Sequence, residues 1–263
     1  MNTPASTPQC HVSHTDDGVA TVRFDNGRLN LLTEDAANIY ARTLGELGRR
    51  EDIRLLVIQG GASAFLGGAD IKFLKDAGKA DTDAYIRSVY RLCETIRDIP
   101  YATMSVISGY CLGAGMEVAA VCDFKIAAAD AQFGMPEVKL GVPSVIHGAM
   151  LPGMIGWTHT RDLLLSGRII GAGLAQAWGL VTEVADEPGQ QGLEAGVTRW
   201  KAEILANGPV SMRIQKKLIR DWERMPLQEA INIGIEGLVS AYETDEPRRY
   251  MEAFLASRKR RAD

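Results

Sequence analysis

The sequence lacks the patterns by which the common nucleotide-binding and hydrolytic folds are recognised. It has no GxxxxGK[ST] segment, and neither GAG triplet, at residues 113–115 or 171–173, continues to the third glycine of the dinucleotide fingerprint. No GxSxG pentapeptide surrounds Ser63, Ser108 or Ser144. These absences argue against a phosphate-loop NTPase, a Rossmann oxidoreductase and an α/β-hydrolase.

Metal-binding and disulfide patterns are missing as well. The histidines show no HExxH spacing, so we expect ordinary surface or core histidines and no metal site; they are His11, His14, His147 and His159. The cysteines show no CxxC spacing, and we interpret them as reduced thiols in a reducing compartment, buried where the sequence around them is apolar; they are Cys10, Cys93, Cys111 and Cys122.

Membrane, export and nucleic-acid signals are weak. No apolar stretch reaches 18 residues, and the polar residues 1–9 do not resemble a secretory signal, so we expect a cytoplasmic protein without a membrane partner. The net charge of −4 argues against a nucleic-acid partner, because such proteins need a basic surface. The basic run at residues 258–261 is interpreted as a solvated helix end.

What the sequence does contain is glycine, at 27 of 263 residues, in an otherwise average composition with 46% hydrophobic and 24% charged residues. A chain of this length favours one large domain with an appendage. We place a core at residues 11–195 and a helical oligomerisation region at 196–263. The glycines either bend the backbone or bring it close to a ligand.

Alternation of strand and helix patterns predicts an α/β fold. Residues 11–14 and 19–24 alternate around Asp16-Asp17-Gly18, which predicts a β-hairpin. Buried strands are predicted at 55–59, 101–107 and 124–128, and helices at 36–47, 82–98 and 113–121, with an N-cap at residues 33–35. Helices between buried strands imply parallel sheets. Four further helices, at 193–206, 210–224, 227–243 and 248–260, are too few to bury their own faces, so we expect them to pack on the body or on a neighbouring subunit.

Two glycine-rich turns follow predicted strands, at residues 63–72 and 108–117. In the first, Gly67 and Gly68 let the backbone approach a ligand, and the N–H of Ala69 is free to point outward. In the second, a helix beginning near Ala114 directs unpaired N–H groups at whatever lies before it. Two such donors suit an enolate or a tetrahedral oxyanion, although tight turns kept small for packing would have the same pattern.

Two glutamates stand out because neither lies in a charge-rich stretch. Glu117 falls in the first turn of an otherwise apolar helix, and Glu137 follows a predicted strand. A glutamate at a helix N-terminus is often only a capping residue. Two carboxylates on either side of a water beside an oxyanion hole would instead form an acid/base pair.

Three long segments resemble the enoyl-CoA hydratase/isomerase (crotonase) superfamily, in the order and spacing of that family. They are AFLGGADIKFL at 64–74, SGYCLGAGMEVAAVCDFKIAAADAQFGMPEVKLGVP at 108–143 and LLLSGRIIGAGLAQAWGLVTEV at 163–184. The resemblance implies a spiral of ββα repeats forming two sheets, with a C-terminal helical region that makes trimers and commonly hexamers. It also implies an acyl-CoA substrate, no separate cofactor and no metal.

The resemblance also implies roles for individual residues. Ala69 and Ala114 supply the backbone N–H groups of the oxyanion hole, and alanine stands at 114 where the family usually has glycine. Glu117 and Glu137 match the two glutamates of true hydratases, so they hold one water: Glu117 assists its attack on Cβ, and Glu137 supplies the proton to Cα. Further substrate contacts are expected at Arg28, Gly68, Asp70, Ile71, Lys72, Gly113, Pro143 and His147, with 258–261 as a further candidate for the CoA phosphates. Asp70 and Asp123 are expected to cap turns.

One segment departs from the hydratase pattern. Residues 142–150 read VPSVIHGAM in place of a glycine-rich run, and they are about one residue shorter. His147, Val145 and Ile146 are candidates for narrowing the acyl pocket; His147 could also take part in acid/base chemistry or simply cap or pack at a helix start.

From the resemblance and the two glutamates, the leading expectation for the function is an enoyl-CoA hydratase. The alternatives are a Δ3,Δ2-enoyl-CoA isomerase, a hydratase of a branched or carboxylated enoyl-CoA, and a non-catalytic acyl-CoA-binding or RNA-binding assembly protein.

Overall fold

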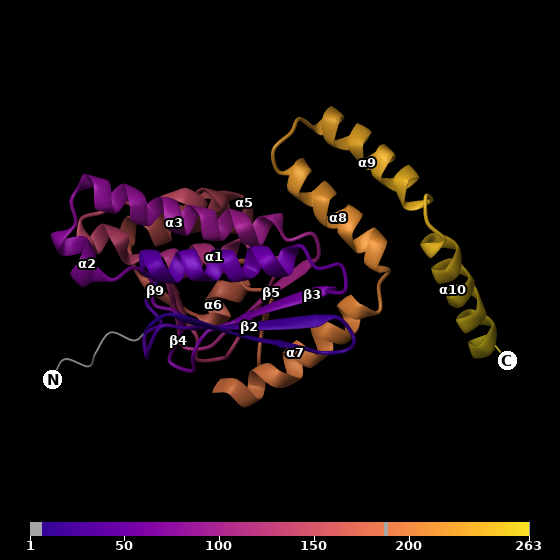
Figure 1. The fold of residues 1–263 in the computed structure, drawn as a ribbon, viewed down its shortest axis with the longest axis horizontal. Coiled ribbons are helices and arrows are strands. Elements are labelled where there is room, and N and C mark those ends of the chain that lie inside the picture. Colours follow the sequence, from indigo (N-terminus) through magenta and orange to yellow (C-terminus); the bar gives the residue numbers. More distant parts are fainter. Residues whose placement is uncertain (1–6, 187–188, 263) are drawn as a thin grey trace.

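The computed structural model describes residues 7–186 and 189–262 as a mixed α/β body with a helical arm (Figure 1). The strands are β1 (Gln9–His14), β2 (Val19–Asp25), β3 (Leu55–Gln59), β4 (Ala64–Leu66), β5 (Ala102–Ile107), β6 (Tyr110–Leu112), β7 (Phe124–Ala127), β8 (Gln132–Gly134), β9 (Ile169–Gly171) and β10 (Glu183–Val184). The α-helices are α1 (Glu34–Gly48), α2 (Ile71–Asp76), α3 (Lys79–Asp98), α4 (Ala114–Ala120), α5 (Leu151–Ser166), α6 (Ala172–Ala177), α7 (Gly189–Leu205), α8 (Pro209–Trp222), α9 (Leu227–Ala241) and α10 (Glu246–Ala262); the 3-10 helices are η1 (Pro136–Leu140) and η2 (Ile146–Met150).

The strands form two sheets whose order reveals a repeat. The larger sheet has the order β1-β2-β3-β5-β7-β10 and the smaller one β4-β6-β8-β9. The pairs β3/β4, β5/β6 and β7/β8 each place their first strand in the larger sheet and their second in the smaller one. All pairings are parallel except β1 with β2 and β8 with β9. This repetition confirms the predicted crotonase-like spiral.

The predicted elements of the body are confirmed, with modest differences at their ends. Gly18 closes the β1–β2 hairpin with φ of +88°, a backbone conformation that favours glycine because it is strained in residues with a Cβ atom. The Thr33 hydroxyl accepts a hydrogen bond from the N–H of Ala36 and caps α1. Helix α3 begins three residues earlier than predicted, because the N–H of Gly78 donates to the Asp81 carboxylate and extends the helix start.

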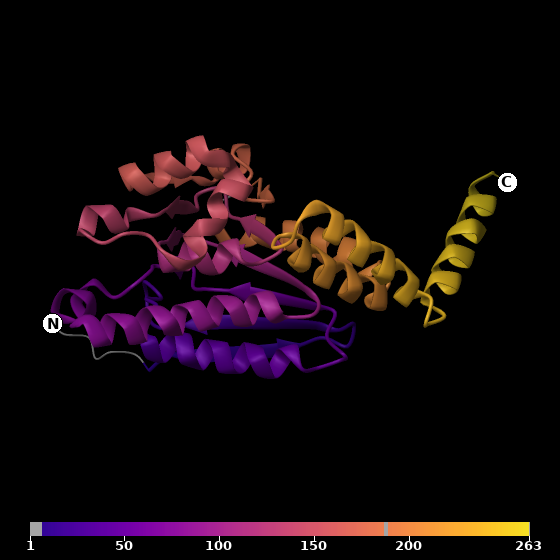
Figure 2. The same cartoon turned by 90° about the horizontal axis from the view of Figure 1, so that it is seen from above.

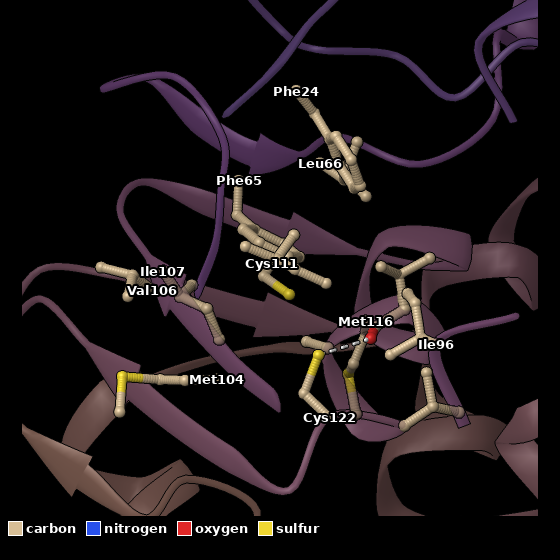
Figure 3. Close-up of a cluster of buried hydrophobic side chains, with 14 of the residues drawn as sticks. Phe24, Phe65, Leu66, Ile96, Met104, Val106, Ile107, Cys111, Met116 and Cys122 are labelled. Atoms are coloured by element: carbon tan, nitrogen blue, oxygen red, sulfur yellow. Dashed lines mark hydrogen bonds between the residues drawn. The ribbon is translucent and has the colours of Figure 1, made fainter. Parts of the chain in front are cut away.

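The core lies between the sheets and the helices that cover them. Phe65 of β4, Cys111 of β6 and Met116 of α4 belong to one cluster of buried side chains (Figure 3). Three of the four cysteines are buried, and Cys10 is half-buried; all four are free thiols. Since this apolar cluster supports β4, β6 and α4 together, it holds the two glycine-rich turns in place.

The last three helices leave the body as an arm (Figures 1 and 2). Helix α8 is tied to the body by Lys216, which contacts Asp123, and by Arg213, which donates to the carbonyl oxygen of Ile53 at 2.9 Å. Helices α9 and α10 extend farther from the sheets. Among the described residues, no helix combines the length and apolar character needed to cross a bilayer.

Candidate active site

Helix α4 begins at the end of β6 and points its first turn at the candidate site. Gly113 precedes it with φ of +54°, a conformation that favours glycine, and its N–H donates to the carbonyl oxygen of Gly134 at 2.9 Å. Ala114 is the first residue of the helix, so its N–H has no acceptor within the helix. Glu117 follows in the same turn and is 4% exposed.

The surroundings of Glu117 keep its carboxyl group protonated at neutral pH. Burial raises its pKa to about 8, and the nearby charge of Glu137 acts in the same direction. The N–H of Gly148, in η2, donates to Oε1 of Glu117 at 2.9 Å and opposes the rise by stabilising the carboxylate. A buried carboxyl group that titrates near neutrality suits proton transfer.

Glu137 approaches the same helix N-terminus from η1. Its Oε2 accepts a hydrogen bond from the Ser144 hydroxyl at 2.7 Å. Its Oε1 lies so close to Gly113 that a Cβ atom added there would collide with it. The structure therefore brings Glu117 and Glu137 together from two elements, at the beginning of α4.

The two glycine-rich turns touch through their main chains. Gly68 has φ of +89°, and a Cβ atom added to it would lie 2.9 Å from the carbonyl oxygen of Leu112. The Gly68 carbonyl oxygen accepts from the N–H of Leu32 at 2.8 Å, which fixes the position of the first turn. Ala69 and Ala114, which follow Gly68 and Gly113, thus lie on adjoining turns.

Helix α3 brings a residue to the site that the sequence did not single out. Tyr85 is 5% exposed, and among the described residues no hydrogen-bond partner is present for its hydroxyl. Burial raises its pKa, and the charges of Glu117 and Glu137 raise it further, so the hydroxyl remains a donor near both carboxyl groups. Tyr85 continues the buried stripe of α3, which gives the same sequence signal as a core residue.

His147 is buried beside the site but is held by α3. Its Nε2 lies 2.8 Å from Oε1 of Glu94, and its ring stacks on Tyr90 with centroids 5.8 Å apart. Burial lowers the pKa of His147, while the Glu94 carboxylate opposes that shift. Tyr90 itself is 47% exposed, at the edge of α3 against which η2 packs.

Most of the expected substrate contacts lie in the body, whereas Arg258 of the basic run lies on the arm. Arg28 and Lys72 are exposed: Lys72 ends the first turn, and Arg28 precedes Leu29, whose carbonyl oxygen accepts from the N–H of Gly67 in that turn at 3.0 Å. Ile71 is 55% exposed on α2, and Pro143 is exposed next to Ser144. Arg258 is exposed on α10, a helix that lies at the other end of the molecule from α2 (Figure 1). The side chains at 259–261 lie outside the described residues.

Of the two aspartates expected to cap turns, Asp70 caps a helix, whereas Asp123 bonds to residues distant in the chain. The Asp70 carboxylate accepts from the N–H of Lys72 at 2.9 Å and caps α2. Asp123 accepts from the N–H and hydroxyl of Thr103 at 2.7 and 2.8 Å, and it also contacts Lys216. Asp123 therefore joins β5 to the segment before β7 and to the arm.

Comparison with known proteins identifies the family of the chain. A family model described as enoyl-CoA hydratase/isomerase matches residues 14–261. The chain belongs to this family. A crotonyl-CoA hydratase of Syntrophomonas wolfei is 31% identical over 212 residues, which are 79% of each chain. A probable enoyl-CoA hydratase of Mycobacterium bovis, echA8, is 32% identical over 233 residues, 88% of each chain.

Solved structures of the enoyl-CoA hydratase/isomerase family share the fold. The enoyl-CoA hydratase of Bacillus anthracis superposes with a TM-score of 0.88 at 24% identity, over 94% of this chain and 96% of that one. Pseudomonas aeruginosa DspI superposes with a TM-score of 0.88 at 26% identity, over 94% of each chain. Coverage this broad includes the arm as well as the two sheets.

Proposed function

We propose that the protein is an enoyl-CoA hydratase, which reversibly adds water to a trans-2-enoyl-CoA thioester. The observation that carries the proposal is the convergence of Glu117 and Glu137 at the beginning of α4, beside two adjoining turns. Relatives named as hydratases at about 30% identity support the same reaction. In this proposal the N–H groups of Ala69 and Ala114 bind the thioester oxygen.

At rest the pair carries one proton, on Glu117, and before the reaction this proton passes through the bound water to Glu137. Glu117 takes a proton from a bound water as its oxygen forms a bond to Cβ, and the double-bond electrons move onto the thioester as an enolate. The N–H groups of Ala69 and Ala114 stabilise the enolate oxygen. Glu137 then gives the proton that it received through the water to Cα. Glu117 keeps the proton taken from the added water, so the pair ends with one proton on Glu117, as it began.

Amide substitutions at the two glutamates test the proposal. We expect Glu117→Gln and Glu137→Gln each to lower kcat for crotonyl-CoA or a longer enoyl-CoA by ~10²–10⁴-fold, because each removes one proton-transfer group. The measurement is the loss of enoyl-thioester absorbance. Glu203→Gln, an exposed glutamate on α7, is the matched control and keeps the parent rate. Undiminished turnover by Glu137→Gln would sink the assignment.

The alternative reactions make different demands on the same site. Isomerisation from Δ3 to Δ2 needs a single carboxyl group to carry a proton between two carbons, so two converged carboxyl groups favour hydration. A panel of straight, branched and carboxylated enoyl-CoA thioesters, analysed by mass spectrometry, distinguishes hydration from isomerisation. Tight binding of acyl-CoA without turnover of any thioester would support a non-catalytic binding protein instead.

We further propose that Arg28 and Lys72 bind the CoA phosphates and that the chain assembles as a homotrimer or a dimer of trimers. Both cations are exposed beside the first turn, where a thioester bound at Ala69 would place the CoA moiety. The exposed apolar faces of α9 and α10 support assembly, because an isolated chain would leave them in water.

A further inference from the structure

Glu94 lies at a junction of three elements next to the site. Its Oε1 is 2.8 Å from Nε2 of His147 in η2 and 3.3 Å from Nη1 of Arg97 in α3. Its Oε2 is 3.3 Å from Arg224 and 3.7 Å from Arg220, at the end of the arm helix α8. The Glu94 side chain is 20% exposed, and these partners lower its pKa despite its burial, so it is a carboxylate at neutral pH.

The His147 ring is neutral and oriented by this carboxylate. Its Nδ1 is buried and has no partner among the described residues, so the proton belongs on Nε2, which donates to Glu94. Stacking on Tyr90 fixes the plane of the ring. The other charged groups that face His147 are Arg97 and Arg224, and both disfavour a positive ring.

The turn that His147 anchors is strained. Ile146, the residue before it, has φ of +40°, a region that a β-branched residue occupies only when its surroundings hold it there. Two residues later, the N–H of Gly148 is shared between the carbonyl oxygen of Val145 at 3.0 Å and Oε1 of Glu117 at 2.9 Å. The orientation of this turn therefore decides how strongly Gly148 binds Glu117.

We propose that the Glu94–His147 pair is a positioning device for Glu117: it holds the strained turn at Ile146 so that the Gly148 N–H remains on the Glu117 carboxyl group. His147 is then a positioning residue, which acts through Gly148. The consequence for catalysis rests on the proposed hydratase function, but the effect on Glu117 itself does not. The other titratable groups that face Glu117 are Glu137 of η1 and, on α3, Tyr85 and Cys93.

The direct test is the titration of Glu117 in variants of His147. His147→Phe keeps the ring stacked on Tyr90 but removes the donor, so the turn relaxes and the Gly148 N–H leaves the carboxylate. We expect the Glu117 titration to move upward by about one pH unit. His147→Gln retains a donor that reaches Glu94, and we expect the parent titration. The measurement is infrared difference spectroscopy of the carboxyl band that Glu117→Gln removes, which needs no substrate.

Two further variants complete the test. His159→Phe makes the same substitution in α5, where His159 stacks on Trp178 with centroids 4.1 Å apart, and leaves the titration unchanged. Glu94→Gln keeps an acceptor for His147 but loses the negative charge that pairs with Arg97, Arg220 and Arg224. We therefore expect it to shift the Glu117 titration upward by less than His147→Phe does. It also serves as the deciding variant if His147→Phe does not fold, which circular dichroism and the Tm report.

The outcomes separate the two proposals. An upward shift in His147→Phe, reversed in His147→Gln, supports the positioning role whether or not an enoyl-CoA is hydrated. A Glu117 titration that is the same in His147→Phe, Glu94→Gln and the parent overturns it. If these shifts occur but no thioester is turned over, the hydratase proposal fails and the positioning role stands.

Discussion

Glu117 and Glu137 lie at the beginning of the same helix in different surroundings. Glu117 is almost completely buried and accepts a backbone N–H from Gly148, whereas Glu137 is half-buried and accepts the hydroxyl of Ser144. Burial raises the pKa of Glu117 and places the resting proton of the pair on it. Two chemically identical side chains are thereby prepared for different roles.

This distribution of charge predicts an alkaline limb in the activity. In the proposed reaction the glutamate pair carries one proton in both directions, and Glu117 holds it with a pKa of about 8. As the pH rises through this value the pair loses its proton, so we expect kcat/KM to fall tenfold per pH unit above about 8. Because hydration consumes no net proton, the dehydration rate must show the same limb. A profile flat from pH 7 to 10, measured in both directions, would contradict the assignment.

Sequence patterns were sufficient for some residues of the site and not for others. Glu117 and Glu137 stood out because neither lies in a charge-rich stretch, and their roles as a pair were predicted from the resemblance to the hydratase family. Glu94 and Tyr85 were not, because Glu94 looks like any solvent-facing charge on a helix and Tyr85 like any core residue. The partner of Glu94 is 53 residues away in the chain, and only the tertiary fold joins them.

At the scale of elements, long periodic segments were predicted well and short ones were missed. Strands β4, β6, β8, β9 and β10 have two or three residues each, too few for an alternation to be visible. The 3-10 helices η1 and η2 have no periodic signal either, although they carry Glu137 and His147. The site was thus predicted as a set of residues, but not as the meeting of α4 with η1 and η2.

Gly113, the residue before α4, should tolerate no side chain. In Gly113→Ala, the new Cβ atom would collide with Oε1 of Glu137 at a residue with φ of +54°. We expect Glu137 to be displaced and kcat for enoyl-CoA hydration to fall by ~10²-fold, with a loss of stability of about 1–3 kcal/mol. The control is Gly173→Ala in α6, where an added Cβ meets nothing within 4 Å. A Gly113→Ala enzyme with the parent kcat would show that Glu137 is free to move without cost.

At the scale of the whole molecule, the arm has two different faces. Gly234 and Gly237 of α9 face α8, and a Cβ atom added at Gly237 would lie 2.9 Å from Leu218. A second, exposed face carries apolar side chains at helical spacing, each 48–77% exposed: Leu227, Ile231, Ile235, Leu238 and Tyr242. A stripe of this length in water indicates a surface made for another chain.

Charge placed on this stripe should break the proposed trimer. We expect Ile235→Glu combined with Leu238→Glu to reduce the mass in solution from three or six chains to one, because burying two carboxylates in an apolar interface is unfavourable. Size-exclusion chromatography with light scattering measures the mass at fixed concentration. Asn232→Glu adds a charge to a neighbouring exposed position of α9 and keeps the parent mass. A parent protein that is already a single chain would refute the assembly.

The contact between the glycine-rich turns also has a meaning for how such a protein can change over evolutionary time. Gly68 meets Leu112, and Gly115 meets Leu66, through main-chain atoms that every amino-acid sequence possesses. Substitutions at exposed positions of residues 142–150, such as Val142 and Val145, can accumulate without altering this seam as long as the glycines remain, whereas Ser144, His147 and Gly148 hold the groups around the two glutamates. The chain therefore separates an inherited backbone frame from a side-chain lining that is open to innovation, and a mutagenesis library aimed at new substrates belongs in the lining.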